Sequence, residues 1–160
     1  MYSTRVSWHV NAPRSRVYEA LVDGDTVARW RVPAGMRSQI HEFDAREGGA
    51  VRISLTYDAP EHSGKTVAHT DTYHGHFLKL VPDELVVEQI EFETEESDLR
   101  GTMTMTTTLS DADGGTEVTV LHEGIPDGVP AAENEEGTRM ALAALASLVE
   151  GRSSTAVDHH

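Results

Sequence analysis

The sequence predicts an α+β fold in which a curved, seven-stranded antiparallel sheet wraps around a long C-terminal helix, with two short helices after the first strand. Three observations lead to this prediction. Residues 4–10 alternate as a strand does and precede two short stretches with helical spacing. From Met36 to Glu123 the apolar period is two, and turn residues interrupt it at intervals. Residues 131–150 return to the helical period.

The segment between the first strand and Trp30 predicts the two short helices. Asn11 is a suitable N-cap, and Pro13 fits the first turn of the first helix. The Asp-Gly pair at 23–24 ends this helix, and Asp25 can cap the second one, which ends near Trp30. Both helices therefore separate the first strand from the other strands along the chain.

The central region predicts six further strands. Short connections between consecutive strands indicate antiparallel hairpins rather than crossovers. The final helix, over 131–150, is the only element long enough to cover one face of such a sheet, and a cavity between them is a natural small-molecule pocket. The expected strands lie near 36–44, 49–58, 66–80, 84–94, 99–110 and 116–123.

The length of 160 residues fits one domain, expected over 1–152, followed by a flexible C-terminal tail at 153–160. The chain has no cysteine, which excludes disulfides and thiolate sites. Its start has no basic region followed by a long apolar run, and no segment approaches the length of a membrane span. We therefore expect a cytoplasmic protein with no membrane partner.

The negative charge is concentrated in the second half of the chain. The formal net charge is −14; residues 1–79 carry 10 Lys and Arg against 9 Asp and Glu, whereas residues 80–160 carry 3 against 18. A field of this sign repels phosphate groups, so nucleic acid is excluded as an expected partner. The simplest interpretation is a solvated acidic face, which is favoured over a site for a basic partner.

Four motifs follow one another along the chain. They are an opening helix pair that ends in tryptophan, "VNAPRSRVYEALVDGDTVARW"; an Asp-x-Arg-x-Gly-Gly hairpin, "FDAREGGAVRISL"; a glycine, strand, proline and leucine-valine step, "YHGHFLKLVPDELVVEQ"; and a last hairpin, "GGTEVTVLHEG". Together they resemble the SRPBCC or START-like (Bet v-like) superfamily and, within it, most of all the family of the C-terminal domain of the activator of heat shock protein 90 ATPase. The resemblance covers nearly the whole chain and implies a helix-grip fold.

The sequence departs from this family at the start of the final helix. The family commonly has Gly-Trp there, whereas Thr138 follows Gly137 in this chain. Alanines at 141, 143, 144 and 146 add little volume on the same helix. The missing indole either enlarges the space beside the helix or lets the sheet collapse onto it, and the sequence leaves both outcomes open.

His74 and His76 are candidates for lining the pocket. Side chains two positions apart on a strand point to the same face, and this parity extends to Leu78 and Leu80, which we expect to face the helix. His122 is expected to face inward by the same argument. Pocket lining is favoured over ordinary hydrogen-bonded strand histidines, and both are favoured over a metal site.

The alternative for His74 and His76 is a zinc site. Two imidazoles separated by one strand residue can share one zinc ion, but a third ligand is needed, and Glu88 or His122 could supply it. No metal and no other cofactor is assigned.

The other pocket candidates are side chains of the inner strand faces and of the apolar face of the final helix. Alternation in "MTMTTTL" places two methionines inward, where their flexible side chains suit irregular ligands. For all of these residues, plain core packing is the competing interpretation. They are Trp30, Tyr57, Glu88, Phe92, Met103, Met105, Ala141, Ala144, Leu145 and Leu148.

Two clusters of charged side chains have structural interpretations. Asp111 and Asp113 resemble the start of a calcium loop, but the twelfth position, which needs a bidentate Glu, is His122. Asp113 is therefore expected in a hairpin turn. Asp44 and Arg46 lie two apart on a strand and are expected to pair with each other or with cross-strand partners.

Three functional hypotheses remain. No nucleophile elbow, phosphate loop, dinucleotide fingerprint or zinc-protease motif occurs, so no catalytic residue is assigned. The leading hypothesis is a non-enzymatic protein, monomeric or homodimeric, that binds a small apolar or aromatic molecule in an internal cavity. Association with a chaperone, implied by the family resembled, predicts an exposed apolar patch on the outer sheet face. A small enzyme of the cyclase or hydrolase type predicts a hydrogen bond between Glu88 and a histidine.

Overall fold

The computed structural model describes residues 2–32, 36–57 and 70–158, with side chains for all of these except 57 and 151–158. Within these ranges it confirms the predicted α+β fold, with one antiparallel seven-stranded sheet in the order β1-β7-β6-β5-β4-β3-β2. The strands are β1 (Tyr2–Val10), β2 (Met36–Phe43), β3 (Ala50–Tyr57), β4 (Thr70–Val81), β5 (Leu85–Phe92), β6 (Met103–Ala112) and β7 (Gly115–Ile125). The first four residues of the strand predicted at 66–80 lie outside the described ranges.

Two short helices, α1 (Arg14–Leu21) and α2 (Gly24–Trp30), follow β1 as predicted, but their caps differ from the expectation. Pro13 occupies the N-cap of α1, and its fixed φ suits that position. The carboxylate of Asp23, not that of Asp25, caps α2 by accepting the backbone N–H of Thr26 at 3.0 Å. The Asp23-Gly24 pair that ends the first helix therefore also starts the second one.

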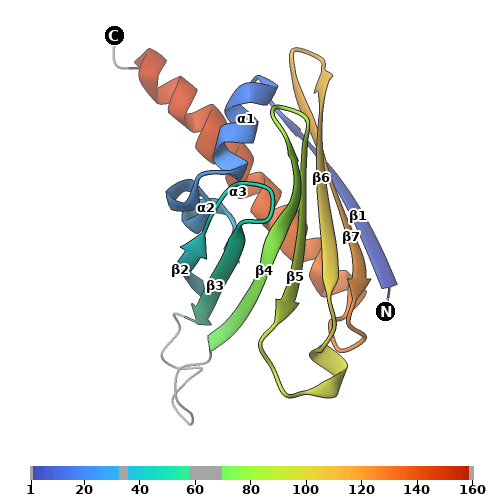
Figure 1. Cartoon of the computed structure of the whole chain (residues 1–160). Coiled ribbons are helices and arrows are strands. Elements are labelled where there is room, and N and C mark those ends of the chain that lie inside the picture. Colours follow the sequence, from blue (N-terminus) through green and yellow to red (C-terminus); the bar gives the residue numbers. More distant parts are fainter. Residues whose placement is uncertain (1, 33–35, 58–69, 159–160) are drawn as a thin grey trace.

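The long helix α3 (Ala131–Asp158) covers the inner face of the sheet and extends beyond the predicted end at 150. In Figure 1, β4 and β5 pass in front of it. Its closest packing against the sheet is with β1, at the edge. The Thr4 hydroxyl of β1 donates to the Asn134 side chain, and near the other end the Glu150 carboxylate accepts the backbone N–H of Asn11 at 2.6 Å. The flexibility expected for 153–160 stays a prediction.

The core lies between the inner face of the sheet and the helices. Phe77 of β4 and Leu145 of α3 are fully buried, and Phe43 packs edge to face on Phe77 with ring centroids 5.5 Å apart. The indole N–H of the buried Trp30 donates to the carbonyl oxygen of Ala20 at 2.9 Å, which ties α2 to α1. Such mutual packing and hydrogen bonding fix the short helices, which are too short to be stable alone.

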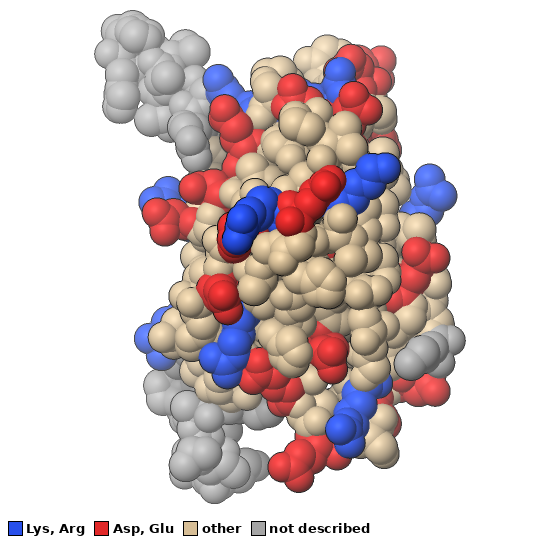
Figure 2. Space-filling view, viewed as in Figure 1, with Lys and Arg blue, Asp and Glu red and all other residues tan. Residues whose placement is uncertain are grey.

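Acidic and basic side chains are interspersed on the face of the molecule seen in Figure 2. Among the described residues, no helix combines the length and apolar character that crossing a bilayer requires.

Gly75 marks a close approach between β4 and β5. A Cβ atom at this position would lie 1.8 Å from the carbonyl oxygen of Gln89, a backbone atom that cannot move aside without disturbing the ladder. By contrast, a Cβ at Gly137 on α3 would meet no heavy atom within 4 Å. The two glycines therefore have opposite structural roles.

We expect Gly75→Ala to lower the free energy of unfolding by about 3 kcal/mol or more, because the added methyl group forces two paired strands apart. Gly137→Ala is the matched control and should raise the same quantity by about 0.5–1 kcal/mol, since alanine favours the helix. Chemical denaturation of the three proteins measures both values. Equal stability of Gly75→Ala and the wild type would show that the strands do not approach each other as described.

Candidate functional site

A cavity of about 260 Å³ lies between α3 and the inner face of the sheet. Its walls come from β3 to β7, from the ends of α1 and α2, and from the first half of α3. Most of the lining side chains are apolar. Of the predicted pocket residues, the structure places these on its walls: Trp30, Glu88, Phe92, Met103, Met105, Ala141 and His122.

Small residues form the middle of the helix side of the cavity, between Asn134 and Leu142. Gly137, Thr138 and Ala141 face the space, and the Thr138 hydroxyl donates to the carbonyl oxygen of Asn134 at 2.8 Å. Nothing fills the position at which a Gly137 side chain would begin. Of the two outcomes left open by the sequence, the structure has an open space beside the helix rather than a sheet that has collapsed onto it, and the packing of α3 on β1 at the sheet edge is consistent with this.

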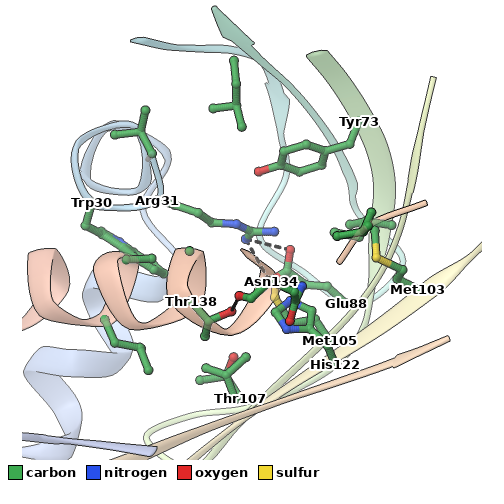
Figure 3. A pocket seen from close by; sticks show the side chains of 18 of the residues that line it. Trp30, Arg31, Tyr73, Glu88, Met103, Met105, Thr107, His122, Asn134 and Thr138 are labelled. Atoms are coloured by element: carbon green, nitrogen blue, oxygen red, sulfur yellow. Dashed lines mark hydrogen bonds and ion pairs between the residues drawn. The ribbon is translucent and has the colours of Figure 1, made fainter. Parts of the chain in front are cut away.

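A buried ion pair crosses the cavity. Arg31, just after α2, donates from Nη1 to both carboxylate oxygens of Glu88 on β5, each at 3.0 Å (Figure 3). The exposed fractions of the two side chains are 13% and 5%. Because both side chains are largely buried, loss of either partner would leave the other charge uncompensated inside the protein, which lowers the stability of the fold.

Tyr73 of β4 completes this polar cluster. Its ring lies beneath the Arg31 guanidinium, 5.6 Å from ring centre to Cζ, so the cation faces the aromatic electrons. Burial raises the pKa of the Tyr73 phenol, and Arg31 only partly offsets this. Burial alone would lower the pKa of Arg31, but Glu88 and Tyr73 outweigh it and raise that pKa, so Arg31 stays charged.

His122 of β7 lies near the ion pair, on the sheet wall (Figure 3). Burial lowers its pKa to about 4, and the positive charge of Arg31 acts in the same direction. The imidazole is therefore neutral at pH 7. Its Nδ1 is buried and has no hydrogen-bond partner among the described residues, which is unusual for a native protein.

His74 and His76 lie on the outer face, so the prediction that they point into the pocket was wrong. The buried residues of this stretch are Tyr73 and Phe77, whereas His74 is half-exposed and His76 is exposed. The zinc hypothesis fails for the same reason, because both suggested third ligands are on the inner face. Among the described residues, no three His, Asp or Glu side chains form a group able to hold a metal ion.

A β-bulge explains the error. The pairing of β4 with β5 shifts between Phe77 and Lys79, so Leu78 is left outside the regular register and is 42% exposed. One extra residue inverts the alternation of a strand. Leu80 does pack against the core, but counting back from it across the bulge assigns every earlier residue to the wrong face.

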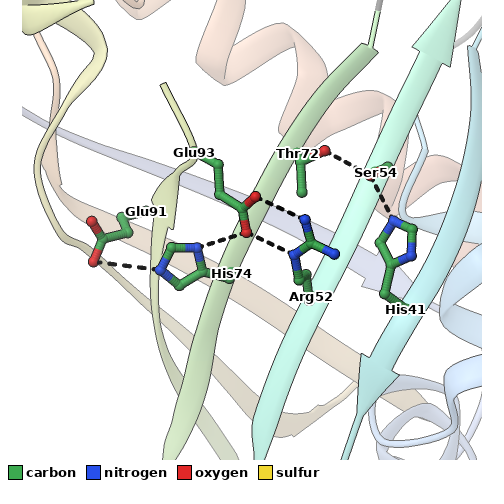
Figure 4. A network of polar contacts seen from close by, with 7 residues as sticks. All are labelled: His41, Arg52, Ser54, Thr72, His74, Glu91 and Glu93. Atoms are coloured by element: carbon green, nitrogen blue, oxygen red, sulfur yellow. Dashed lines mark hydrogen bonds and ion pairs between the residues drawn. The ribbon is translucent and has the colours of Figure 1, made fainter. Parts of the chain in front are cut away.

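The outer face carries its own polar network, built around Glu93 (Figure 4). Arg52 donates to both Glu93 oxygens at 2.8 and 2.9 Å, and the His74 Nδ1 lies 2.9 Å from the same carboxylate. Hydrogen bonds from Arg52, reinforced by His74, lower the pKa of Glu93 to about 2 although burial opposes this. Asp44 and Arg46 pair with each other at 2.7 Å, one of the two predicted outcomes, although they lie between β2 and β3 rather than on a strand.

The remaining predicted pocket residues either lie away from the cavity or have a side chain outside the described part of the structure. Leu145 is a fully buried core residue, and Ala144 and Leu148 pack against the core from the same helix. The side chain of Tyr57 lies outside the described residues.

The sequence patterns did not identify Arg31 and Tyr73 as cavity residues. Tyr73 shares its parity with Phe77, so locating the bulge would have placed it inside. No signal distinguishes Arg31 from the many surface arginines that follow helices, because its partner Glu88 is 57 positions away.

Comparisons with known proteins agree with this fold. The family model of the Activator of Hsp90 ATPase homolog 1-like protein matches residues 11–150. A solved Chromobacterium violaceum protein is 30% identical, with a TM-score of 0.82 over 94% of this chain and 99% of that one. A Rhodobacter sphaeroides protein, 18% identical, has a TM-score of 0.78 over 94% of this chain and 93% of its own. No curated protein matches the sequence.

The buried imidazole predicts a specific pH dependence of stability. The unfolded chain binds a proton at His122 near pH 6.5, whereas the folded chain binds it only near pH 4, so protons favour unfolding across this interval. The contribution of the neutral His122 to the free energy of unfolding is complete above pH 6.5. It falls by up to about 3 kcal/mol as the pH approaches 4. Chemical denaturation from pH 7 to 4 should show this decrease in the wild type and a smaller one in His122→Gln.

His76→Gln, at an exposed position of the same sheet, controls for the loss of an imidazole. Identical pH dependence in wild type and His122→Gln would contradict the assignment of a buried neutral His122.

Proposed function

Because the chain belongs to the family of Activator of Hsp90 ATPase homolog 1-like proteins, within the SRPBCC superfamily, we propose that it binds a small apolar or aromatic molecule inside its cavity. The supporting observation is a space with mainly apolar walls around one buried polar cluster. Binding sites for small molecules have this composition, because apolar area provides affinity and a few polar groups fix the orientation.

The size of the cavity suggests a ligand of about two rings. An engineered apolar cavity of about 150 Å³ in another protein holds one benzene molecule. The cavity described above, at about 260 Å³, is larger by roughly one further ring. Trp30, Met103 and Met105 supply flat and adaptable surfaces for such a ligand.

Chaperone association is the second candidate, and the family description favours it. Its expected surface feature was an exposed apolar patch on the outer sheet face. Among the described residues, Leu78 is the exposed large hydrophobic side chain, which is too little for such a patch. A binding titration with the middle region of Hsp90 tests this candidate directly.

The enzyme hypothesis required a hydrogen bond between Glu88 and a histidine. The Glu88 carboxylate instead accepts from Arg31 through both oxygens, and His122 Nδ1 has no partner within the described structure. This pair therefore lends no support to acid–base chemistry in the cavity.

Filling the cavity should weaken binding. We expect Thr138→Trp, which places an indole where the small helix residues leave space, to weaken binding of 2-acetylnaphthalene at least about tenfold, a loss of 1.4 kcal/mol or more. A ligand-observed NMR titration measures the dissociation constant, and thermal unfolding checks that the variant is folded.

Ala132→Trp provides the matched control, since it adds the same side chain at an exposed position of the same helix. It should bind like the wild type. Unchanged binding by a folded Thr138→Trp protein would remove the cavity from consideration as the binding site.

A further inference from the structure

The polar cluster inside the cavity carries no net charge. Arg31 contributes one positive charge and Glu88 one negative charge, and the two carboxylate oxygens both contact a single guanidinium nitrogen. The neighbouring Tyr73 and His122 are neutral at pH 7, because burial raises the pKa of the phenol and lowers that of the imidazole. A ligand that enters this space therefore meets dipoles and a compensated ion pair rather than a free charge.

Hydrogen-bonding capacity remains in this cluster. The contact with Glu88 uses Nη1 of Arg31, and the Tyr73 hydroxyl accepts a further hydrogen bond from the guanidinium, which still leaves donors among its five N–H groups. On the sheet wall, one strand beyond Met105 from Glu88, the His122 ring is about nine-tenths buried and its Nδ1 has no partner among the described residues. Buried polar groups of this kind are normally satisfied, which indicates that another group joins the cluster.

From this geometry we infer that the cavity selects an uncharged aromatic molecule with one polar oxygen, a ketone or a phenol in chemical class, whose oxygen lies against the Arg31–Glu88 pair. The inference rests on the proposed binding function and specifies the ligand of that same site. An oxygen that accepts from Arg31 adds no net charge to the buried cluster, and the rings fill the apolar remainder of the cavity.

An anionic ligand is disfavoured in two places. Inside, Glu88 already neutralises Arg31, so a second carboxylate would be buried without a free cation. At the rim, the exposed Glu133 borders the cavity, and the neighbouring Tyr2 has its pKa raised by burial and then by Asp127, Glu133 and Glu135. The surroundings of the entrance are therefore negative, which repels anions as they approach.

A cationic ligand is disfavoured by Arg31. The guanidinium stays charged and, after burial itself, is the second cause of the lowered pKa of His122. Positive charge at this wall is therefore unfavourable whether it belongs to an imidazolium or to the ammonium group of a ligand.

Four naphthalene probes with the same ring system test the inference: 2-acetylnaphthalene, naphthalene itself, 2-naphthoate and 2-naphthylmethylammonium. At pH 7.5 we expect the wild type to bind the ketone at least about tenfold more tightly than either ion. We also expect the ketone to bind more tightly than naphthalene. Ligand-observed NMR titrations give the four dissociation constants.

Two Glu→Gln substitutions, one inside the cavity and one on the surface, then test whether the buried charge sets the ligand preference. Glu88→Gln leaves Arg31 without its counter-charge, so the ratio of the ketone's affinity to that of 2-naphthoate should fall at least about tenfold. Glu93→Gln removes an equal charge from the outer face, where Arg52 holds it, and should keep the wild-type ratio.

The outcomes distinguish failure of the proposed binding function from failure of the proposed selectivity. Absence of binding by all four probes would overturn the proposed function itself. If the probes bind but 2-naphthoate binds as tightly as the ketone, only the selectivity is overturned.

If Glu88→Gln does not fold, the double variant Arg31→Met, Glu88→Met replaces the pair with apolar side chains, a change that proteins often tolerate. The ketone should then lose its advantage over naphthalene, and a retained advantage would refute a role for the pair.

Discussion

The ion pair between Arg31 and Glu88 is the interaction on which the arrangement of the cavity depends. It joins the residue after α2 to the middle of the sheet, across a space that is otherwise bordered mainly by apolar side chains. Both side chains are largely buried, so loss of one partner would leave a costly buried ion. The pair thereby fixes α2 relative to β5 and places a polar group inside an apolar space.

The position of α3 explains why this space exists. The helix is fastened to the edge strand β1 rather than to the middle of the sheet, and Thr4 and Asn134 make one of these attachments. Gly137, Thr138 and Ala141 then face the central strands without reaching them. Family membership accounts for the fold, whereas these small residues account for the volume that this chain leaves unfilled.

The element order and the sheet followed from local patterns, because period-two alternation and short turns act over a few residues. His122, Glu88 and the two methionines followed from the same alternation. His74 and His76 did not, because a bulge is a local change of register that composition does not reveal. The Arg31–Glu88 pair depends on tertiary contact between distant residues, so no sequence pattern could have identified it.

A crystal structure of the protein with 2-acetylnaphthalene would test the central claim most directly. The account predicts electron density for the rings between α3 and the sheet, with the ketone oxygen within hydrogen-bonding distance of the Arg31 guanidinium and the Glu88 contact retained. Rings bound elsewhere, or an oxygen that points away from Arg31 toward the entrance, would contradict it.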